Sequence, residues 1–287
     1  TSRRQRQMCI RDSLGTAAYE GFPGLFCECE ACQKANAEGG KNIRLRASMT
    51  INEDTLIDFG PDIYMQKLRY NLNLANIRHF IMTHSHSDHF NPFDLMARSE
   101  GNYSHFQGEN KGSKINVYGN EKVKEFFDFA VKVEFGGHQD FMNYIEVVPF
   151  KTYEVGKLKV TPLLAQHQPD EKSLIYLIEE ERRTLLYAND TGIFPEATYE
   201  YLQNVKLDVV SLDCTHGARY AGGSGHLGLE TCVQTKERLL DMGSACEETT
   251  FIITHFSHNG GLCHEDLEKV AIPHGFVVAY DGMEMKI

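Results

Sequence analysis

Four side chains that can bind a metal ion lie within six residues of the segment THSHSDHF, at His84, His86, Asp88 and His89. Imidazole and carboxylate ligands together suit zinc, manganese or iron. In an extended segment His84 and His86 point to one side, and a turn lets Asp88 and His89 face a neighbouring ion. One ion cannot use all four and keep an open position, so the spacing predicts two catalytic divalent ions. A polar loop with scattered histidines is the weaker interpretation, because HxHxDH is rare by composition.

A second set of metal-binding side chains lies earlier in the chain, at Cys27, Cys29 and Cys32. The chain has eight cysteines, which could indicate disulfides. Three thiols within six residues are more typical of metal binding in a reducing compartment. The alternative is a cluster of reduced thiols without metal. We therefore expect a metal-binding loop here.

The segments around these motifs predict strands that deliver side chains at their ends. SMTI and TLIDFG are short apolar segments separated by residues 52–54, which is typical of a hairpin. A strand at 79–82 precedes the four clustered ligands. Further strands are expected at 115–119, 158–164, 174–178, 184–188, LDVVSLD and TFIITH, and helices at 63–72, 121–135, 229–242 and 265–270. This mixture predicts an α/β fold with two packed sheets and helices outside, a four-layer αββα sandwich.

The domain organisation follows from the length and from the start of the chain. A chain of 287 residues that is 41% hydrophobic can bury a full core, and no linker or repeat divides it. We expect one domain over residues 14–287. Residues 1–13 are charged and alternate poorly, so the sequence leaves them doubtful, as a tag, a scar or an assembly artefact in place of a first strand.

Charge and hydropathy exclude several classes of protein. The formal net charge of −11 argues against bulk binding of nucleic acid, which depends on Lys and Arg. No run of about 18 apolar residues occurs, and the first residues lack the apolar core of a signal peptide. We therefore expect a soluble, cytoplasmic protein with no membrane partner and a small-molecule substrate. Oligomeric state is not predicted, and a homodimer is one option.

The HxHxDH segment resembles the signature of the metallo-β-lactamase superfamily, and the resemblance extends from Gly15 to nearly the end. It implies that His167, Asp190 in LLYANDTG and His255 in FIITHFSH complete the metal site. One ion would be held by His84, His86 and His167 and the other by Asp88, His89 and His255, with Asp190 shared. It also implies that Asp58 in TLIDFG orients a ligand histidine.

The segment GTAAYEGFPGLFCECEACQKA resembles the PhnP family of phosphoribosyl cyclic phosphodiesterases. This resemblance implies a structural zinc held by Cys27, Cys29, Cys32 and His258, in a closed tetrahedral site. It implies that His226 contacts substrate phosphate and assists the leaving group, as a catalytic residue beside Asp88. The function so implied is hydrolysis of a small, possibly cyclic phosphodiester by a hydroxide that bridges the two metal ions.

Several alternatives stay open on the sequence alone. Cys263 and His264 compete with His258 for the zinc, and Asp213 and Thr215 in LDCTH either support the site or only end a strand. Other functions are a nuclease resembling tRNase Z, a relative of the coenzyme-biosynthesis protein PqqB, and a metal-stabilised binding module without turnover. The remaining histidines match no motif; they are His79, His105, His138, His216 and His274.

Overall fold

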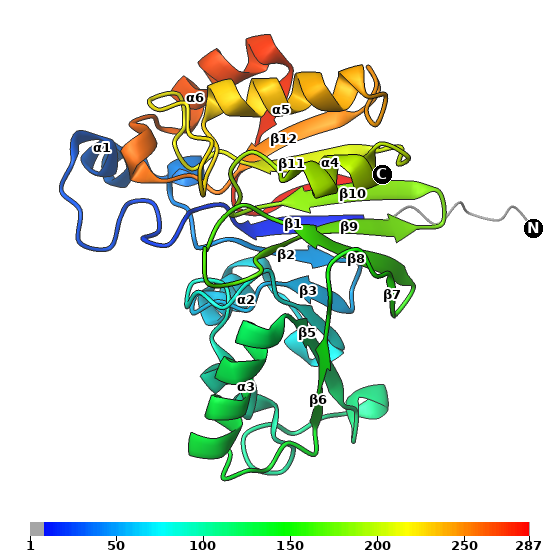
Figure 1. The fold of residues 1–287 in the computed structure, drawn as a ribbon. Helices are drawn as coiled ribbons and strands as arrows, with labels where there is room; N and C mark the ends of the chain where they lie inside the picture. Colours follow the sequence, from blue (N-terminus) through cyan, green and yellow to red (C-terminus); the bar gives the residue numbers. More distant parts are fainter. Residues whose placement is uncertain (1–8, 287) are drawn as a thin grey trace, which may run out of the picture.

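Two seven-stranded sheets face each other in the computed structural model, which describes residues 9–286 (Figure 1). The first sheet has the order β14-β1-β2-β3-β4-β5-β6. Its strands are β1 (Cys9–Gly15), β2 (Ser48–Ile51), β3 (Thr55–Ile57), β4 (His79–Ile81), β5 (Ile115–Gly119), β6 (Met142–Glu146) and β14 (Met283–Lys286). β2 and β3 form the predicted antiparallel hairpin, whereas β3 to β6 run parallel.

The second sheet has the order β13-β12-β11-β10-β9-β8-β7. Its strands are β7 (Tyr153–Val155), β8 (Leu158–Leu164), β9 (Leu174–Glu180), β10 (Arg183–Ala188), β11 (Val209–Asp213), β12 (Thr250–Thr254) and β13 (Phe276–Val278). β10 to β13 run parallel, and β7 to β10 are antiparallel. Each sheet therefore joins an antiparallel part to a parallel part, and the parallel parts carry helical connections.

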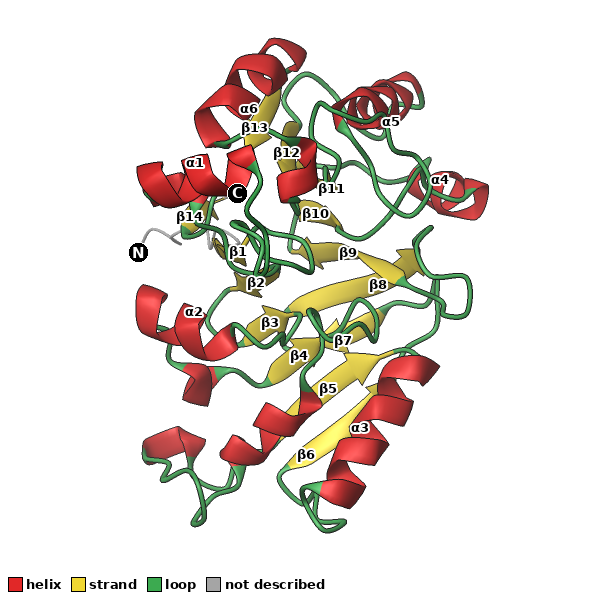
Figure 2. Ribbon diagram, turned by 90° about the vertical axis from the view of Figure 1, so that its left-hand side faces the viewer, coloured by secondary structure: helices red, strands yellow, loops and turns green. Residues whose placement is uncertain are grey.

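Helices cover the outer face of each sheet (Figure 2). They are α1 (Glu30–Glu38), α2 (Ile63–Tyr70), α3 (Glu121–Val133), α4 (Glu196–Leu202), α5 (Leu229–Asp241) and α6 (His264–Ala271). Four of them match predicted helices within two residues at each end. α1 and α4 were not predicted. α1 is a correction to the expected cysteine loop, because Cys32 lies inside the first turn of this helix.

Three layers of apolar side chains hold the four structural layers together. Neighbouring strand residues point to opposite faces, so Ile57 packs between the sheets while Leu56 packs beneath α3. On the other side, Leu186 of β10 packs against side chains from α5 and α6. This arrangement confirms the predicted α/β fold with a four-layer αββα sandwich.

The first sheet includes part of the segment that the sequence left doubtful. β1 starts at Cys9 and pairs with β14 on one side and β2 on the other. The sheet thus begins before residue 14, the expected start of the domain, because Cys9 to Ser13 have pairing partners at Met283–Lys286 that lie far away in the sequence. Residues 1–8 of the doubtful segment fall outside the described residues.

Candidate metal centre

The candidate metal ligands leave the carboxyl ends of strands in both sheets. His84, His86, Asp88 and His89 follow β4, Asp190 follows β10, Asp213 ends β11 and His255 follows β12. Because β10, β11 and β12 are parallel neighbours, their ends meet at one edge of the second sheet. Binding sites in sheets of this kind form outside such carboxyl ends.

The backbone turns sharply where it places these residues. Asp58, Asp190 and His255 have φ angles of 59°, 49° and 62°, in the left-handed region that non-glycine residues seldom adopt. Such conformations persist where the surrounding structure holds them, which is common at functional sites. Residue 60 must be a glycine because the backbone of Asp88 packs against it; a Cβ at this position would lie 2.0 Å from the carbonyl oxygen of Asp88.

Three histidines form the first half of the centre. Nδ1 of His86 lies 2.9 Å from Nε2 of His84 and 3.3 Å from Nε2 of His167. His84 is fully buried, and burial is the main reason that its pKa falls well below its usual value. A neutral imidazole offers a lone pair, so this trio can hold one divalent ion.

The second half is built around Asp190. Oδ2 of Asp190 lies 2.5 Å from Nε2 of His89 and 3.0 Å from Nε2 of His255, and Nε2 of His89 lies 3.1 Å from Oδ2 of Asp88. The other carboxylate oxygen of Asp190 lies 3.8 Å from Nε2 of His167. Asp190 therefore faces both groups of ligands, which is the position that a shared ligand needs.

Four buried atoms of this centre have no hydrogen-bond partner among the described residues. They are Oδ1 of Asp88, Nε2 of His89, Oδ2 of Asp190 and Nε2 of His255. Several lie within contact distance of one another, yet they are not aligned as donor and acceptor. Buried polar atoms are costly without a partner. Potential ligand atoms that converge in this way fit divalent metal ions.

Asp190 and its two histidine neighbours shift one another's pKa values. Burial opposes ionisation of Asp190, but His255 and His89 hold its pKa well below the usual value. Burial would likewise lower the pKa of His255, but Asp190 and Asp213 raise it to about 10. A metal ion must therefore displace protons from His89 and His255 when it binds.

Asp58 contacts His89 from the protein interior. Its Oδ2 lies 2.7 Å from Nδ1 of His89 and accepts a hydrogen bond from the hydroxyl of Thr83, while its Oδ1 accepts one from the backbone amide of Thr83. Both Asp58 and His89 are fully buried. The carboxylate can hold the Nδ1 proton of His89, which would direct Nε2 to a metal ion, the role that the resemblance implied for Asp58.

Asp213 and Thr215 contact two different histidines. Oδ2 of Asp213 lies 2.9 Å from Nδ1 of His226 and 3.4 Å from Nδ1 of His255. The hydroxyl of Thr215 lies 2.8 Å from Nδ1 of His255 and 3.1 Å from Nδ1 of His226. The sequence left their role open, and the structure places both side chains in contact with these two histidines.

His226 lies beside the second half of the centre. Its Nδ1 is 3.6 Å from Oδ1 of Asp190, and its ring stacks on His255 with centroids 5.7 Å apart. Asp190, Asp213, His226 and His255 could together hold an ion, because their ligand atoms lie within 4.8 Å of one another. Since Nδ1 of His226 is bonded to Asp213, only its Nε2 is left for a ligand.

A cavity of about 700 Å³ opens over these groups. Part of its wall was not predicted, because these residues belong to no recognisable motif. These are Tyr19, Glu20, His216, Tyr220, Ser257 and Asn259. The cavity is of the size that holds a small organic ligand.

The four predicted zinc ligands also come together. The Sγ atoms of Cys27 and Cys29 lie 3.4 and 3.6 Å from Nδ1 of His258, and Cys32 completes a group whose ligand atoms lie within 4.8 Å. Burial raises the pKa of Cys29, but hydrogen bonds from Cys32, Cys27 and His258 outweigh it and bring the pKa to about 7. A thiolate is the form that binds zinc.

The two competing zinc ligands lie elsewhere. Nδ1 of His264 lies 3.0 Å from the guanidinium of Arg44, and Nε2 lies 3.1 Å from Glu268. The thiol of Cys263 packs in a small cluster beneath α1 and donates to the carbonyl of Ala31. Neither belongs to the group around His258.

Comparison with known families agrees with this geometry. A family model described as a beta-lactamase superfamily domain matches residues 54–256, which is more than half of the chain. The chain belongs to this superfamily. Members are generally metal-dependent hydrolases, and the clusters of histidine and aspartate found here fit that chemistry. None of the curated proteins matches the sequence.

Solved structures show the same fold at low sequence identity. A diphosphatase of the PhnP family is 23% identical, with a TM-score of 0.77 and 98% of each chain covered. Zinc-bound PqqB from Methylobacterium extorquens is 18% identical, with a TM-score of 0.75 over 98% of this chain and all of that one. Human tRNase Z, short form, is 16% identical, with a TM-score of 0.65 over 97% and 98%. No helix among the described residues is long and apolar enough to cross a membrane.

Proposed function

We propose that the chain is a metal-dependent phosphodiesterase that acts on a small phosphodiester. The observation that carries the proposal is the convergence of seven side chains, Asp190 among them, with four buried atoms that make no hydrogen bond among the described residues, at the base of a cavity that His226 also lines. A centre of this kind suits an anionic substrate, because bound metal ions reverse the local negative field.

The ligands divide into two sets that share Asp190. His84, His86 and His167 would hold one ion, and Asp88, His89 and His255 the other. Zinc, manganese and iron all accept these ligands. Two divalent ions bound here would lower the pKa of a water molecule and neutralise the phosphate.

His226 is the proton donor in this proposal. Asp213 accepts the Nδ1 proton of His226, so Nε2 is free to contact an oxygen of the substrate. Burial lowers the pKa of His226, but Asp213 outweighs this and raises it above the ordinary value, which favours the protonated ring. A protonated His226 can stabilise or protonate the departing alkoxide.

Asp88 has a second role besides metal binding. Its Oδ2 faces His89, while Oδ1 is buried without a partner, and the residue lines the cavity. Oδ1 can accept a hydrogen bond from the attacking water and so orient it toward phosphorus. In this proposal Asp88 is therefore a catalytic residue as well as a metal ligand.

We also propose that Cys27, Cys29, Cys32 and His258 hold a structural zinc. Four ligands close a tetrahedral site and leave no position for substrate. The site would fasten the start of α1 to the segment after β12. Zinc binding would thereby hold the short segment that carries Cys27, Cys29 and Cys32 in one conformation.

An assay of metal-loaded protein with four substrates tests the proposal. They are bis(p-nitrophenyl) phosphate, a ribose 1,2-cyclic phosphate, a nucleoside diphosphate and a tRNA precursor. We expect the two phosphodiesters of low molecular weight to be hydrolysed. Exclusive cleavage of the diphosphate would indicate the activity that the PhnP-family relative is named for, and exclusive cleavage of tRNA would indicate a nuclease. No turnover of any substrate would leave a binding or coenzyme-biosynthesis role.

A further inference from the structure

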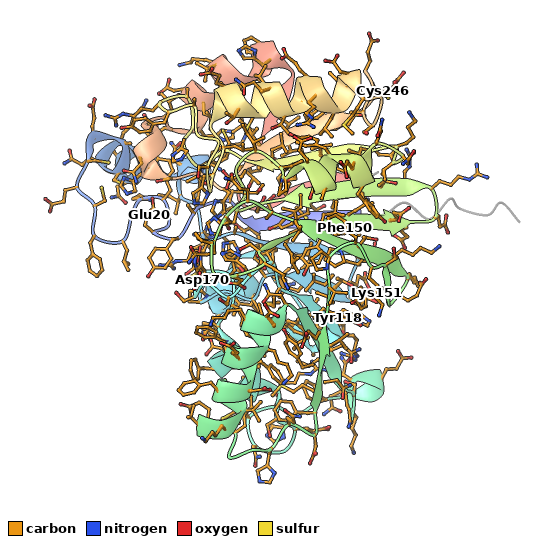
Figure 3. The ribbon with its side chains drawn as sticks, viewed as in Figure 1. Glu20, Tyr118, Phe150, Lys151, Asp170 and Cys246 are labelled. Carbon is orange, nitrogen blue, oxygen red and sulfur yellow. The ribbon has the colours of Figure 1, made fainter. Side chains whose placement is uncertain are left out.

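Glu20 brings a carboxylate to the wall of the cavity from a loop that also approaches the cysteine cluster. The loop runs from the end of β1 to the start of α1, and Figure 3 shows Glu20 on the same side of the molecule as α1. Glu20 lines the cavity together with Ser257 and Asn259. The function proposed above gives this carboxylate no role, either as a metal ligand or as a proton donor.

Both contacts of the Glu20 side chain involve the same oxygen. The hydroxyl of Ser257 donates to Oε1, and Nε2 of His258 lies 3.5 Å from that atom. Among the described residues no hydrogen bond reaches Oε2. The side chain is about a quarter exposed, at 27%. Oε1 therefore anchors the carboxylate and Oε2 is available to a ligand.

The backbone fixes Glu20 next to the segment that follows β12. The amide of Ala18 donates to the carbonyl of Phe256 over 3.0 Å, and the amide of Phe256 donates to the carbonyl of Thr16 over 2.7 Å. Gly24 lets the loop close on His258, since a Cβ there would lie 2.8 Å from the imidazole. The position of Glu20 is thus set by tertiary contacts on both sides.

The cysteine cluster determines which atom of His258 faces Glu20. The thiols of Cys27 and Cys29 both lie against Nδ1 of His258. If zinc bound at Nδ1, the ring proton would be on Nε2, which could then only donate, and Oε1 of Glu20 is an acceptor within reach. The carboxylate of Glu20 therefore connects the cysteine cluster to the cavity.

We propose that Glu20 determines specificity by accepting a hydrogen bond from a hydroxyl group of the substrate, while His258 and Ser257 hold it in place. The inference rests on the proposed phosphodiesterase function, and what it adds is the residue that recognises the alcohol part of the substrate. The group that Glu20 would contact is a free hydroxyl close to phosphorus.

A neutral hydroxyl group of the substrate suits the cavity wall at Glu20 better than a charged group does. A carboxylate repels the phosphate itself, so Glu20 must face another part of the substrate. An ammonium group would meet two divalent ions and a protonated His226 in the same cavity, which is unfavourable. A hydroxyl carries no charge and donates a strong hydrogen bond to a carboxylate.

The test compares Glu20→Ala with Glu28→Ala. Glu28 is an exposed carboxylate of the same loop that does not line the cavity, so it is the matched control. We expect Glu20→Ala to lower kcat/KM for a ribose 1,2-cyclic phosphate by about 10-fold or more, the scale of a hydrogen bond to a charged group. Turnover of bis(p-nitrophenyl) phosphate, which has no hydroxyl, should change less than about 2-fold. Glu20→Gln, which keeps an acceptor, should recover part of the loss.

Binding of products gives a readout that does not depend on turnover. Calorimetry should show weaker binding of ribose 1-phosphate to Glu20→Ala by a similar factor, with binding of methyl phosphate unchanged. Equal losses for both ligands, or no loss for either, would overturn the role of Glu20. Better binding of phosphoethanolamine than of ribose 1-phosphate by the wild type would also overturn it. Failure of the wild type to hydrolyse any phosphodiester would refute the proposed function, and the binding comparison would still decide the role of Glu20.

Discussion

Oδ2 of Asp213 lies 2.9 Å from Nδ1 of His226, and Asp213 is fully buried at the end of β11. Such a contact holds the ring in one orientation and fixes the proton on Nδ1. The other ring nitrogen is then free for the substrate. We therefore propose for His226 a role distinct from that of the seven proposed ligands.

Replacing His226 by alanine is expected to lower turnover of a cyclic or alkyl phosphodiester by about 100-fold or more, the usual scale for loss of a general acid. Metal content should change little. The loss should shrink for bis(p-nitrophenyl) phosphate, because p-nitrophenolate leaves without a proton. Steady-state kinetics on both substrates measure this, with His138→Ala, an exposed histidine, as control. Equal losses would assign His226 to phosphate positioning, and loss of metal would make it a ligand.

The sequence predicted the fold and the first four candidate ligands, because both follow from local patterns such as HxHxDH after a buried strand. His167, Asp190 and His255 were assigned through the resemblance to the metallo-β-lactamase superfamily, because a single histidine or aspartate at the end of a strand is too weak a signal by itself. The packing of Ile57 between the sheets likewise follows from alternation in a short apolar strand.

Other features could not be predicted, because they depend on contacts between distant segments. α1 has only Ala31, Cys32 and Ala35 as buried residues, so its apolar pattern is too weak to indicate a helix. The contact of Glu20 with Ser257 joins residues 237 positions apart. The pairing of β1 (Cys9–Gly15) with β14 (Met283–Lys286) has the same origin, so the strand at Cys9 could not be located from the sequence alone.

Asp58→Asn is expected to weaken binding of one catalytic ion by about 10- to 100-fold. Burial raises the pKa of Asp58, and His89 beside it favours the charged form. The amide keeps the shape of the side chain but cannot accept the Nδ1 proton of His89 in the same way. Titration with Mn²⁺ measures the affinity. Unchanged affinity for both ions would remove Asp58 from the support of the centre.

Cys29→Ser is expected to release one tightly held zinc and lower the melting temperature, because a structural metal contributes its binding energy to folding. The catalytic ligands should be spared. Cys246→Ser is the matched control, since Cys246 is an exposed free thiol outside the cluster. Metal counting after gentle chelation gives the result. The same zinc content in both variants would exclude Cys29 as a ligand.

Affinity for the catalytic metals is expected to rise with pH. Asp190 and Asp213 outweigh the effect of burial and raise the pKa of His255 to about 10, and His89 is shifted in the same direction. Both rings are therefore protonated without metal at neutral pH, and each must lose a proton to bind an ion. Calorimetry in buffers of different ionisation enthalpy should detect proton release. Binding with no proton release and no dependence on pH would contradict the assignment of His89 and His255.

Asp190 is the residue on which the dinuclear account depends, since it faces both groups of ligands. The decisive measurement is the metal content of wild type and Asp190→Ala, together with phosphodiesterase turnover of the same samples. The wild type should hold two catalytic ions per chain in addition to the zinc of the cysteine cluster. Asp190→Ala should remain folded by circular dichroism, lose catalytic metal and fall in turnover by orders of magnitude. A folded variant with both catalytic ions and normal turnover would contradict the account.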